Sequence, residues 1–111
     1  MILYISGPMT GYPDFNRPAF HEAEAQLELA GYETISPAYI RLPHIKEPTW
    51  GQWMRPAITL MMGATGVATL PNHLESRGAR LELQIARELG MMVRTVEEWL
   101  DLELPTHNYH Y

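Results

Sequence analysis

Short apolar segments alternate along this chain with longer segments in which apolar residues recur at helical spacing. The apolar segments are MILYIS at the start and, later, residues 32–36, 66–71 and 91–94. Gly, Pro or polar turn residues separate them from their neighbours, as is typical of buried strands. Strands that alternate with helices imply right-handed crossovers and a mostly parallel sheet with helices on both faces. We therefore expect an α/β fold, namely a three-layer Rossmann- or flavodoxin-like domain with a sheet of four to five strands.

The first helical segment carries signals at both ends. Asn16 can cap a helix that has Pro18 in its first turn. Gly31 supplies the C-terminal stop. Residues 37–49 contain three prolines and little periodicity, so we expect a loop there.

The later helical segments are equally well marked. A helix is expected to begin after Thr49, but Pro56 lies inside it and predicts a kink or two short helices. Residues 76–89 form the next predicted helix. Thr95 and Glu98 make a capping box for a short last helix.

The size and charge of the chain limit its partners. Its 111 residues suffice for one domain, so we expect a single domain over residues 1–111, with residues 101–111 as a C-terminal tail. The formal net charge of −5 argues against a nucleic-acid polymer as partner, because such proteins must neutralise phosphates. The chain has no cysteine, which excludes disulfides and thiolate chemistry. Its apolar start is too short for a signal sequence or membrane span, so we expect a cytoplasmic protein without a membrane partner.

One carboxylate stands among the apolar residues of the segment ESRGARLELQIARELG, residues 75–90. At 100° per residue, Glu82 lies near the middle of a broad apolar arc. Removing a charge from water costs several kcal/mol unless it is compensated. Glu82 could therefore pair with a buried arginine or reach the rim, or it could point into a ligand crevice and act as a nucleophile. The apolar residues of the arc are Ala79, Leu81, Leu83, Ile85, Ala86 and Leu89.

The predicted fold indicates where such a crevice lies. In open α/β sheets, ligands bind beyond the carboxyl ends of the strands. Two loops leave such ends, residues 6–16 after the first strand and residues 71–78 after the third. The second loop ends in Ser76-Arg77-Gly78, which offers a hydroxyl cap, a cation and a glycine at a helix N-terminus. Free N–H groups there favour an anion, and one loop can hold a single phosphate monoester.

Two long motifs resemble a known superfamily. The stretches YISGPMTGYPDFNRPAF and LPNHLESRGARLELQIARELGMMV resemble the nucleoside 2-deoxyribosyltransferase-like superfamily, and above all a small-protein branch found often in phages and prophages. The resemblance covers about residues 2–94. Its better-known enzymes, the nucleoside deoxyribosyltransferases and the deoxynucleoside 5′-monophosphate N-glycosidases, share the motif S/D-x-G-x-x-x-E-L-x-x-A. This chain matches that motif with Ser76, Gly78, Glu82, Leu83 and Ala86.

The resemblance implies an N-glycosidase or 2-deoxyribosyltransferase that acts on a nucleoside or its 5′-monophosphate. It implies that Glu82 attacks C1′ of the sugar and forms a glycosyl ester, and that Ser76 binds the 5′ phosphate or hydroxyl. It also implies that a small-molecule nucleoside or nucleotide is the partner, without a cofactor or a metal ion. The other substrate-binding residues that we expect are Tyr4, Ser6, Gly7, Met9, Asn16 and Gly78.

The chain departs from the superfamily pattern at the residue that would protonate the departing base. Relatives commonly carry an aspartate two residues after an arginine in this region, whereas here Arg55 is followed by a proline and then by Ala57. His73 or Glu75 could substitute as the acid, and Arg77 is a further candidate site residue. The alternative function is a non-catalytic nucleotide-binding or interaction protein that kept the pocket. Which base and sugar are accepted, and whether water or a second base is the acceptor, stay open.

The remaining candidates have simpler interpretations. His107 and His110 fall in the predicted tail and are interpreted as tail residues rather than as a metal site. Trp50 and Trp53 are interpreted as core or interface residues rather than as a platform for a base. With Met61 and Met62, they are expected to support a homodimer or a higher even-numbered oligomer, as in the superfamily. The glycines of the first loop do not match a dinucleotide fingerprint.

Overall fold

The computed structural model describes residues 1–102 and has the expected α/β fold, with a sheet of four parallel strands. The strands are β1 (Ile2–Ser6), β2 (Glu33–Ile35), β3 (Gly66–Thr69) and β4 (Met92–Thr95). They lie in the order β2-β1-β3-β4, so the next two strands along the chain, β2 and β3, lie on opposite sides of β1. The carboxyl ends of β1 and β3 therefore flank the switch point at which ligands bind in open α/β sheets.

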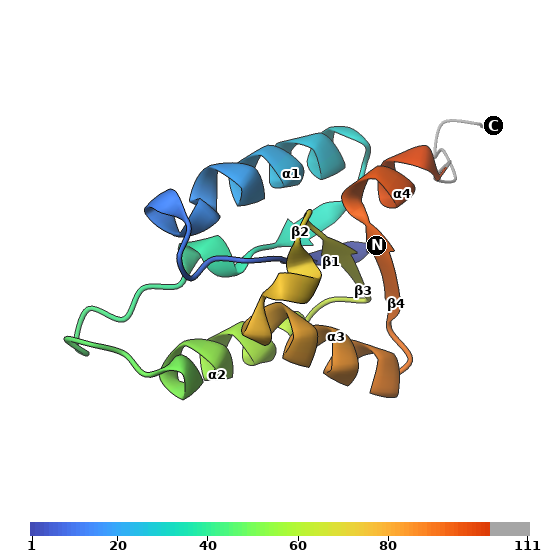
Figure 1. Cartoon of the computed structure of the whole chain (residues 1–111). Coiled ribbons are helices and arrows are strands. Elements are labelled where there is room, and N and C mark those ends of the chain that lie inside the picture. The colour runs from blue at the N-terminus through green and yellow to red at the C-terminus, as the bar shows by residue number, and fades with distance from the viewer. Residues whose placement is uncertain (103–111) are drawn as a thin grey trace.

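Two helices cover each face of the sheet, as Figure 1 shows. The helices α1 (Arg17–Leu29) and α4 (Val96–Asp101) lie on one face, and α2 (Trp50–Met61) and α3 (Arg77–Glu88) lie on the other. Short 3₁₀ turns precede α1, follow β2 and precede α3, at Pro13–Asn16, Pro37–Tyr39 and His73–Glu75. Within residues 1–102, none of the helices has the length and apolar character needed to cross a membrane.

The alternation of side chains along β1 divides the core into two parts. Successive residues of a strand point to opposite faces. Leu3 and Ile5 pack in the cluster beneath α1 and α4, whereas Tyr4 packs with Met61 of α2 and Leu83 of α3. Ser6, two residues after Tyr4, is completely buried as well. The α3 side of β1 therefore carries two hydroxyl groups inside the protein.

The predicted helix signals are largely confirmed. The side chain of Ser76 accepts a hydrogen bond from the backbone of Ala79 and caps α3. Thr95 and Glu98 form the predicted capping box at the start of α4. Thr49 begins α2 with a capping box of its own.

Three local predictions are corrected. Asn16 precedes α1 but has left-handed backbone (φ 60°), and its side-chain amide donates to the carbonyl of Pro8 instead of capping the helix. Pro56 does not divide its segment into two helices, since α2 runs from Trp50 to Met61 with Pro56 inside it, whereas the kink stays a prediction; the capping box and the buried Met54, Ala57 and Met61 support the helix on both sides of the proline. Leu89, at the end of the apolar arc, is exposed, because α3 ends at Glu88 and Leu89 is only its C-cap residue.

The loop predicted between residues 37 and 49 begins with the short 3₁₀ turn Pro37–Tyr39. His107 and His110, and the part of the predicted tail after residue 102, lie outside the described residues.

Trp99 of α4 contacts both β3 and the residue that precedes β2, so its substitution is expected to lower the stability of the fold. Its indole nitrogen donates to the carbonyl of Val67 at 2.8 Å, and its ring packs edge-on to Tyr32. We expect Trp99→Phe to lower the free energy of unfolding by about 2–4 kcal/mol, because it removes buried volume and a buried hydrogen bond. Urea unfolding measures this loss. The half-buried Trp53 is the control, and an equal loss in Trp53→Phe would contradict the assignment of Trp99 to the core.

Candidate functional site

The Glu82 carboxylate is buried against β1 and held by two hydroxyl groups. Only 4% of the residue is exposed. The Tyr4 hydroxyl donates to Oε2 at 2.5 Å, and the Ser6 hydroxyl donates to Oε1 at 2.7 Å. The two donors are two residues apart on β1 and so point to the same face, which is the face that α3 covers. Each carboxylate oxygen therefore has one fixed donor from the same strand.

This environment makes the carboxylate harder to ionise. Burial raises the pKa of Glu82 from 4.5 to about 7, although the hydrogen bonds from Tyr4 and Ser6 oppose the change. Burial and the neighbouring Glu82 charge raise the pKa of Tyr4 well above its ordinary value, so its hydroxyl stays a donor. Among the described residues, no arginine, lysine or histidine forms an ion pair with Glu82. The alternative in which Glu82 pairs with a buried arginine is therefore not what the structure shows.

A pocket of about 310 Å³ opens beside Glu82. Its wall is formed by the loop after β1, the start of α1, the 3₁₀ turn after β2, α2 and the first half of α3. Phe15 and Trp53 both line it and form a tilted aromatic pair, with ring centroids 6.4 Å apart and an interplanar angle of 39°. The wall is mostly apolar, so a ligand inside is shielded from water and polar contacts gain strength. The lining residues are Gly7, Met9, Thr10, Phe15, Arg17, Pro37, Ile40, Pro48, Trp50, Trp53, Met54, Ala57, Ser76, Gly78, Ala79 and Glu82.

The N-terminus of α3 forms one side of this pocket. Ser76 and Gly78 both line it. The Ser76 hydroxyl accepts a hydrogen bond from the N–H of Ala79. The N–H groups of Arg77 and Gly78 have no partner within residues 1–102. Gly78 lets the side chain of Met54 pack against the start of α3, since a Cβ there would come within 2.9 Å of the sulfur of Met54. Two free N–H groups and the positive end of the helix dipole together favour an anionic group at this position.

The residues expected from the sequence fall into three groups in space. Gly7, Met9, Ser76, Gly78 and Glu82 come together around the pocket. Tyr4 and Ser6 were expected to line the sugar and base pocket, but they lie behind Glu82 and contact its carboxylate. Their hydroxyls are therefore placed to position Glu82 rather than to touch a ligand.

The other expected residues are not part of the pocket wall. These are Asn16, Arg55, His73, Glu75 and Arg77. Arg55 and Glu75 are exposed, and a ring nitrogen of His73 contacts the carbonyl of Leu70. The guanidinium of Arg77 stacks on the ring of Trp50, 3.7 Å from its centre, so it lies behind a lining residue.

The tryptophans of α2 are not core residues. Trp50 and Trp53 are both half-buried and line the pocket, and their place at a subunit interface stays a prediction. Met61 was expected at a subunit interface, but it is completely buried in the core beneath α2 and α3. Ala57 also lines the pocket. The spacing of residues 50, 53 and 57 places them on one face of a helix, and this pattern could have identified them as pocket residues. Nothing in the sequence identified Phe15 or Arg17 as such.

The comparison with known families gives one match. The profile of a family described as "Domain of unknown function (DUF4406)" matches residues 1–95, and the chain therefore belongs to this family. No curated protein sequence matches the chain.

The raised pKa of Glu82 predicts a pH-dependent loss of stability. A carboxyl group whose pKa is higher in the folded state than in the unfolded state favours folding in its protonated form, so its ionisation destabilises the fold as pH rises from about 4.5 to 7. Glutamine mimics the protonated acid and does not ionise. We expect Glu82→Gln to be as stable as the wild type near pH 4.5 and more stable by up to about 3 kcal/mol at pH 8.

Chemical denaturation of both proteins across this pH range measures the difference. A variant that is less stable than the wild type at every pH would contradict a desolvated charge and indicate that the ionised carboxylate stabilises the fold.

Proposed function

We propose that this member of the DUF4406 family cleaves the N-glycosidic bond of a nucleoside or nucleoside 5′-monophosphate, with Glu82 as the nucleophile. The observation that carries the proposal is a buried carboxylate on the wall of an apolar pocket, with a hydroxyl donor fixed on each oxygen. Such a carboxylate is shielded from water and held in one orientation, which favours attack on an electrophilic carbon. The resemblance of the two long motifs to the nucleoside 2-deoxyribosyltransferase-like superfamily supports the same role.

In the first step, an oxygen of the Glu82 carboxylate attacks C1′ of the sugar. A C1′–O bond forms while the C1′–N bond breaks, and the electron pair of the broken bond leaves with the base. A proton from solvent or from a side chain neutralises the departing base. The carboxylate oxygen that does not react becomes the ester carbonyl and still accepts one hydrogen bond, from Tyr4 or Ser6.

In the second step, the glycosyl ester is broken. For a hydrolase, water attacks C1′, the ester C1′–O bond returns its electron pair to Glu82, and the second proton of the water is released. For a transferase, a ring nitrogen of another base takes the place of water. Two displacements at C1′ retain its configuration in either case.

Other residues of the pocket wall suit the other parts of a nucleotide. The free N–H groups of Arg77 and Gly78 would receive a 5′ phosphate or hydroxyl, with the Ser76 hydroxyl beside them. One of the aromatic side chains of the wall, Phe15 or Trp53, would stack on one face of the base. The sugar would then lie beside Glu82.

One observation favours the second candidate function, a nucleotide-binding protein without activity. Ala57 lines the pocket at the position where the superfamily commonly carries an aspartate. An alanine cannot protonate the departing base. General acids typically contribute roughly 10²–10⁴-fold, so the chain could bind a nucleotide and cleave it slowly or not at all.

Base release tests the proposal directly. Deoxynucleosides and their 5′-monophosphates are incubated with the protein, with and without an added free base, and the released base is quantified by chromatography. We expect release from at least one compound, and a decrease of at least about a thousandfold in Glu82→Gln, because that amide cannot form the ester. Activity that survives this substitution would show that Glu82 is not the nucleophile.

Tyr4→Phe is the matched control, since it keeps the carboxylate but removes one of its donors. Wild-type kcat/KM should rise with pH and level off above about pH 7, as Glu82 ionises in the free protein. The hydrogen bond from Tyr4 lowers the pKa of Glu82, so the midpoint should move to higher pH in Tyr4→Phe. An unchanged midpoint would mean that another group controls the profile.

Ala57→Asp tests whether a missing acid limits the reaction. The helix α2 continues through Pro56, and Ala57 lines the pocket, so the new carboxyl would lie where the base leaves. We expect kcat to increase at least about tenfold, a cautious value for general acid catalysis. Thr59→Asp adds the same charge at an exposed position of α2 and should give no gain.

An unchanged kcat in Ala57→Asp would show that protonation of the departing base does not limit the reaction. If the wild type then bound nucleotides without releasing base, the second candidate function would hold. If it bound none, both candidate functions would be wrong.

A further inference from the structure

The pocket wall contains one carboxyl group among the described residues, and that group is Glu82 itself. Within residues 1–102, the only other lining side chain with a charge is Arg17. In a displacement at C1′, the attacking oxygen and the departing base lie on opposite sides of that carbon. Glu82 therefore cannot act as nucleophile and protonate the base in the same step. The hydroxyl groups of Thr10 and Ser76 also line the pocket, but an alcohol is a far weaker acid than a carboxyl group.

The residues that could replace the missing acid lie away from the wall. Ala57 lines the pocket, but it has no proton to give. Glu75 is exposed, and neither it nor His73 lines the pocket. A ring nitrogen of His73 contacts the carbonyl of Leu70 at 3.0 Å. A neutral base that departs with the electron pair of its glycosidic bond needs a proton, and the described wall is poorly equipped to supply one.

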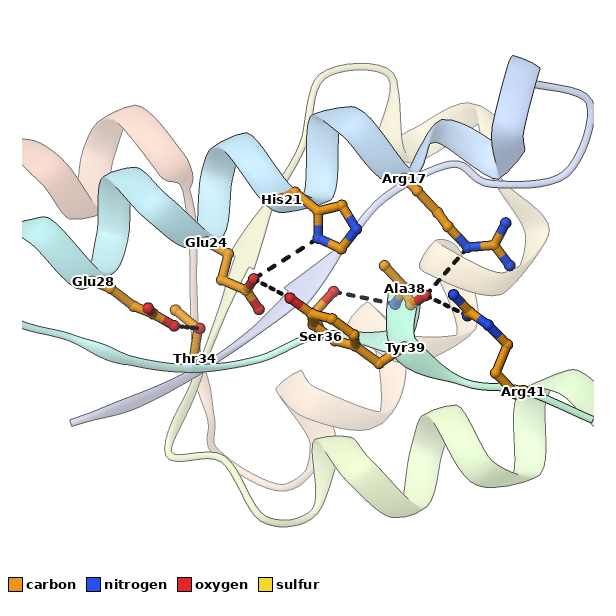
Figure 2. Close-up of polar contacts among 9 residues, drawn as sticks. All are labelled: Arg17, His21, Glu24, Glu28, Thr34, Ser36, Ala38, Tyr39 and Arg41. Carbon is orange, nitrogen blue, oxygen red and sulfur yellow. Dashed lines mark hydrogen bonds and ion pairs between the residues drawn. The ribbon is translucent and has the colours of Figure 1, made fainter.

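Arg17 does not supply this proton either, because a guanidinium stays charged in proteins. Its Nε donates to the carbonyl of Ala38 at 3.3 Å, and the same carbonyl accepts a hydrogen bond from Arg41 at 2.9 Å (Figure 2). Its Nη1 forms an ion pair with the Asp14 carboxylate at 3.1 Å. Since Asp14 balances the charge of Arg17, the unbalanced charge that the described wall brings to the pocket is the negative charge of Glu82.

The aromatic side chains of the wall suit a positively charged ring. A cation is attracted to the face of an aromatic ring, and more strongly when it is out of water. The guanidinium of Arg17 lies 5.0 Å from the ring centre of Phe15, and that of Arg77 lies 3.7 Å from the ring centre of Trp50. Among the described residues, no cation lies over Trp53. Trp53 is therefore the lining ring that could receive a cation from a ligand.

We propose that the substrates of this pocket are nucleosides or nucleotides whose base carries a positive charge, such as an N7-alkylated purine or a pyridinium ring. This inference rests on the proposed function and specifies its leaving group. An oxygen of Glu82 forms a bond to C1′ while the C1′–N bond breaks. The electron pair of the broken bond moves onto the base and neutralises its positive charge. The base then departs as a neutral molecule, and this step needs no proton.

The charge of such a substrate also acts on the nucleophile. A positive charge close to a carboxyl group favours its ionised form. The attraction between them is stronger in an apolar pocket than in water. A cationic base would therefore favour the carboxylate form of Glu82, which is the form that attacks C1′.

Three nucleotides that differ by one methyl group test the inference. They are the 5′-monophosphates of 2′-deoxyguanosine, of its cationic N7-methyl derivative and of its neutral N²-methyl derivative. The assays are run on the acid side of neutrality, where the N7-methylated base keeps its N1 proton and its charge. Base release is measured by chromatography, and the release seen with Glu82→Gln is subtracted. We expect kcat/KM for the N7-methyl nucleotide to exceed that of the other two at least about a hundredfold, the lower end of what general acids contribute.

Ala57→Asp separates the role of the charge from the intrinsic lability of a methylated purine. With an acid at residue 57, the neutral nucleotides should gain at least about tenfold in kcat. The N7-methyl nucleotide should change by less than about twofold, because its base departs without a proton. The comparison of the three nucleotides in the wild type needs no change at Ala57, so it stays decisive if the variant fails to fold.

Three results would overturn the inference while the proposed function stands. The first is Glu82-dependent release of the neutral and N7-methylated bases with equal kcat/KM. The second is an equal advantage of the N²-methyl nucleotide, which would assign the preference to the methyl group and not to the charge. The third is an equal effect of Ala57→Asp on the cationic and neutral nucleotides. Absence of Glu82-dependent release from every nucleotide would remove the proposed function together with the inference.

Discussion

The contact of the Glu82 carboxylate with the hydroxyls of Tyr4 and Ser6 is the interaction on which this site depends. It takes a charged group out of water and gives each of its oxygens one donor from β1. The two effects oppose each other, since burial disfavours the ionised form and the hydrogen bonds favour it. The resulting pKa of about 7 leaves both protonation states populated at neutral pH. A buried carboxylate that ionises at neutral pH lowers the stability of the folded protein. An apolar residue would avoid this cost in a core position without a function.

The fold explains why these groups meet. The strand order brings the carboxyl ends of β1 and β3 together at the switch point, and α3 starts from the loop that follows β3. One face of α3 then covers Tyr4 and Ser6, while its N-terminus lies at the pocket with two N–H groups that have no partner in residues 1–102. The start of α1 and the face of α2 complete the wall with Phe15, Arg17 and the tryptophans. The same few elements thus supply a nucleophile, an anion position and an aromatic wall.

The sequence predicted the fold class and pointed to Glu82, because both depend on local periodicity. A carboxylate in the middle of an apolar arc and Ser76 at a helix start are visible without any tertiary information. The partners of Glu82, Tyr4 and Ser6, could not be predicted. Both faces of a central strand are buried, and only the packing of α3 shows which face of β1 the carboxylate contacts. Arg17 and Phe15 reach the pocket through left-handed backbone at residues 14–16, which no periodicity reveals. The place of Trp50 and Trp53 on the pocket wall could not be predicted, because a half-buried aromatic face has the same sequence pattern whether it meets a core, a subunit or a ligand.

Trapping the glycosyl ester tests the central claim, that Glu82 is a nucleophile, more directly than any rate. A 2′-fluoro-arabinosyl nucleoside or its 5′-monophosphate slows the breakdown of such an ester, and mass spectrometry of the digested protein then locates the added sugar. Trypsin releases Glu82 in the peptide LELQIAR, residues 81–87, which contains no other carboxylate side chain. The account predicts a sugar adduct on this peptide, absent from Glu82→Gln. An adduct on another peptide, or base release from natural substrates with no adduct on residues 81–87, would contradict it.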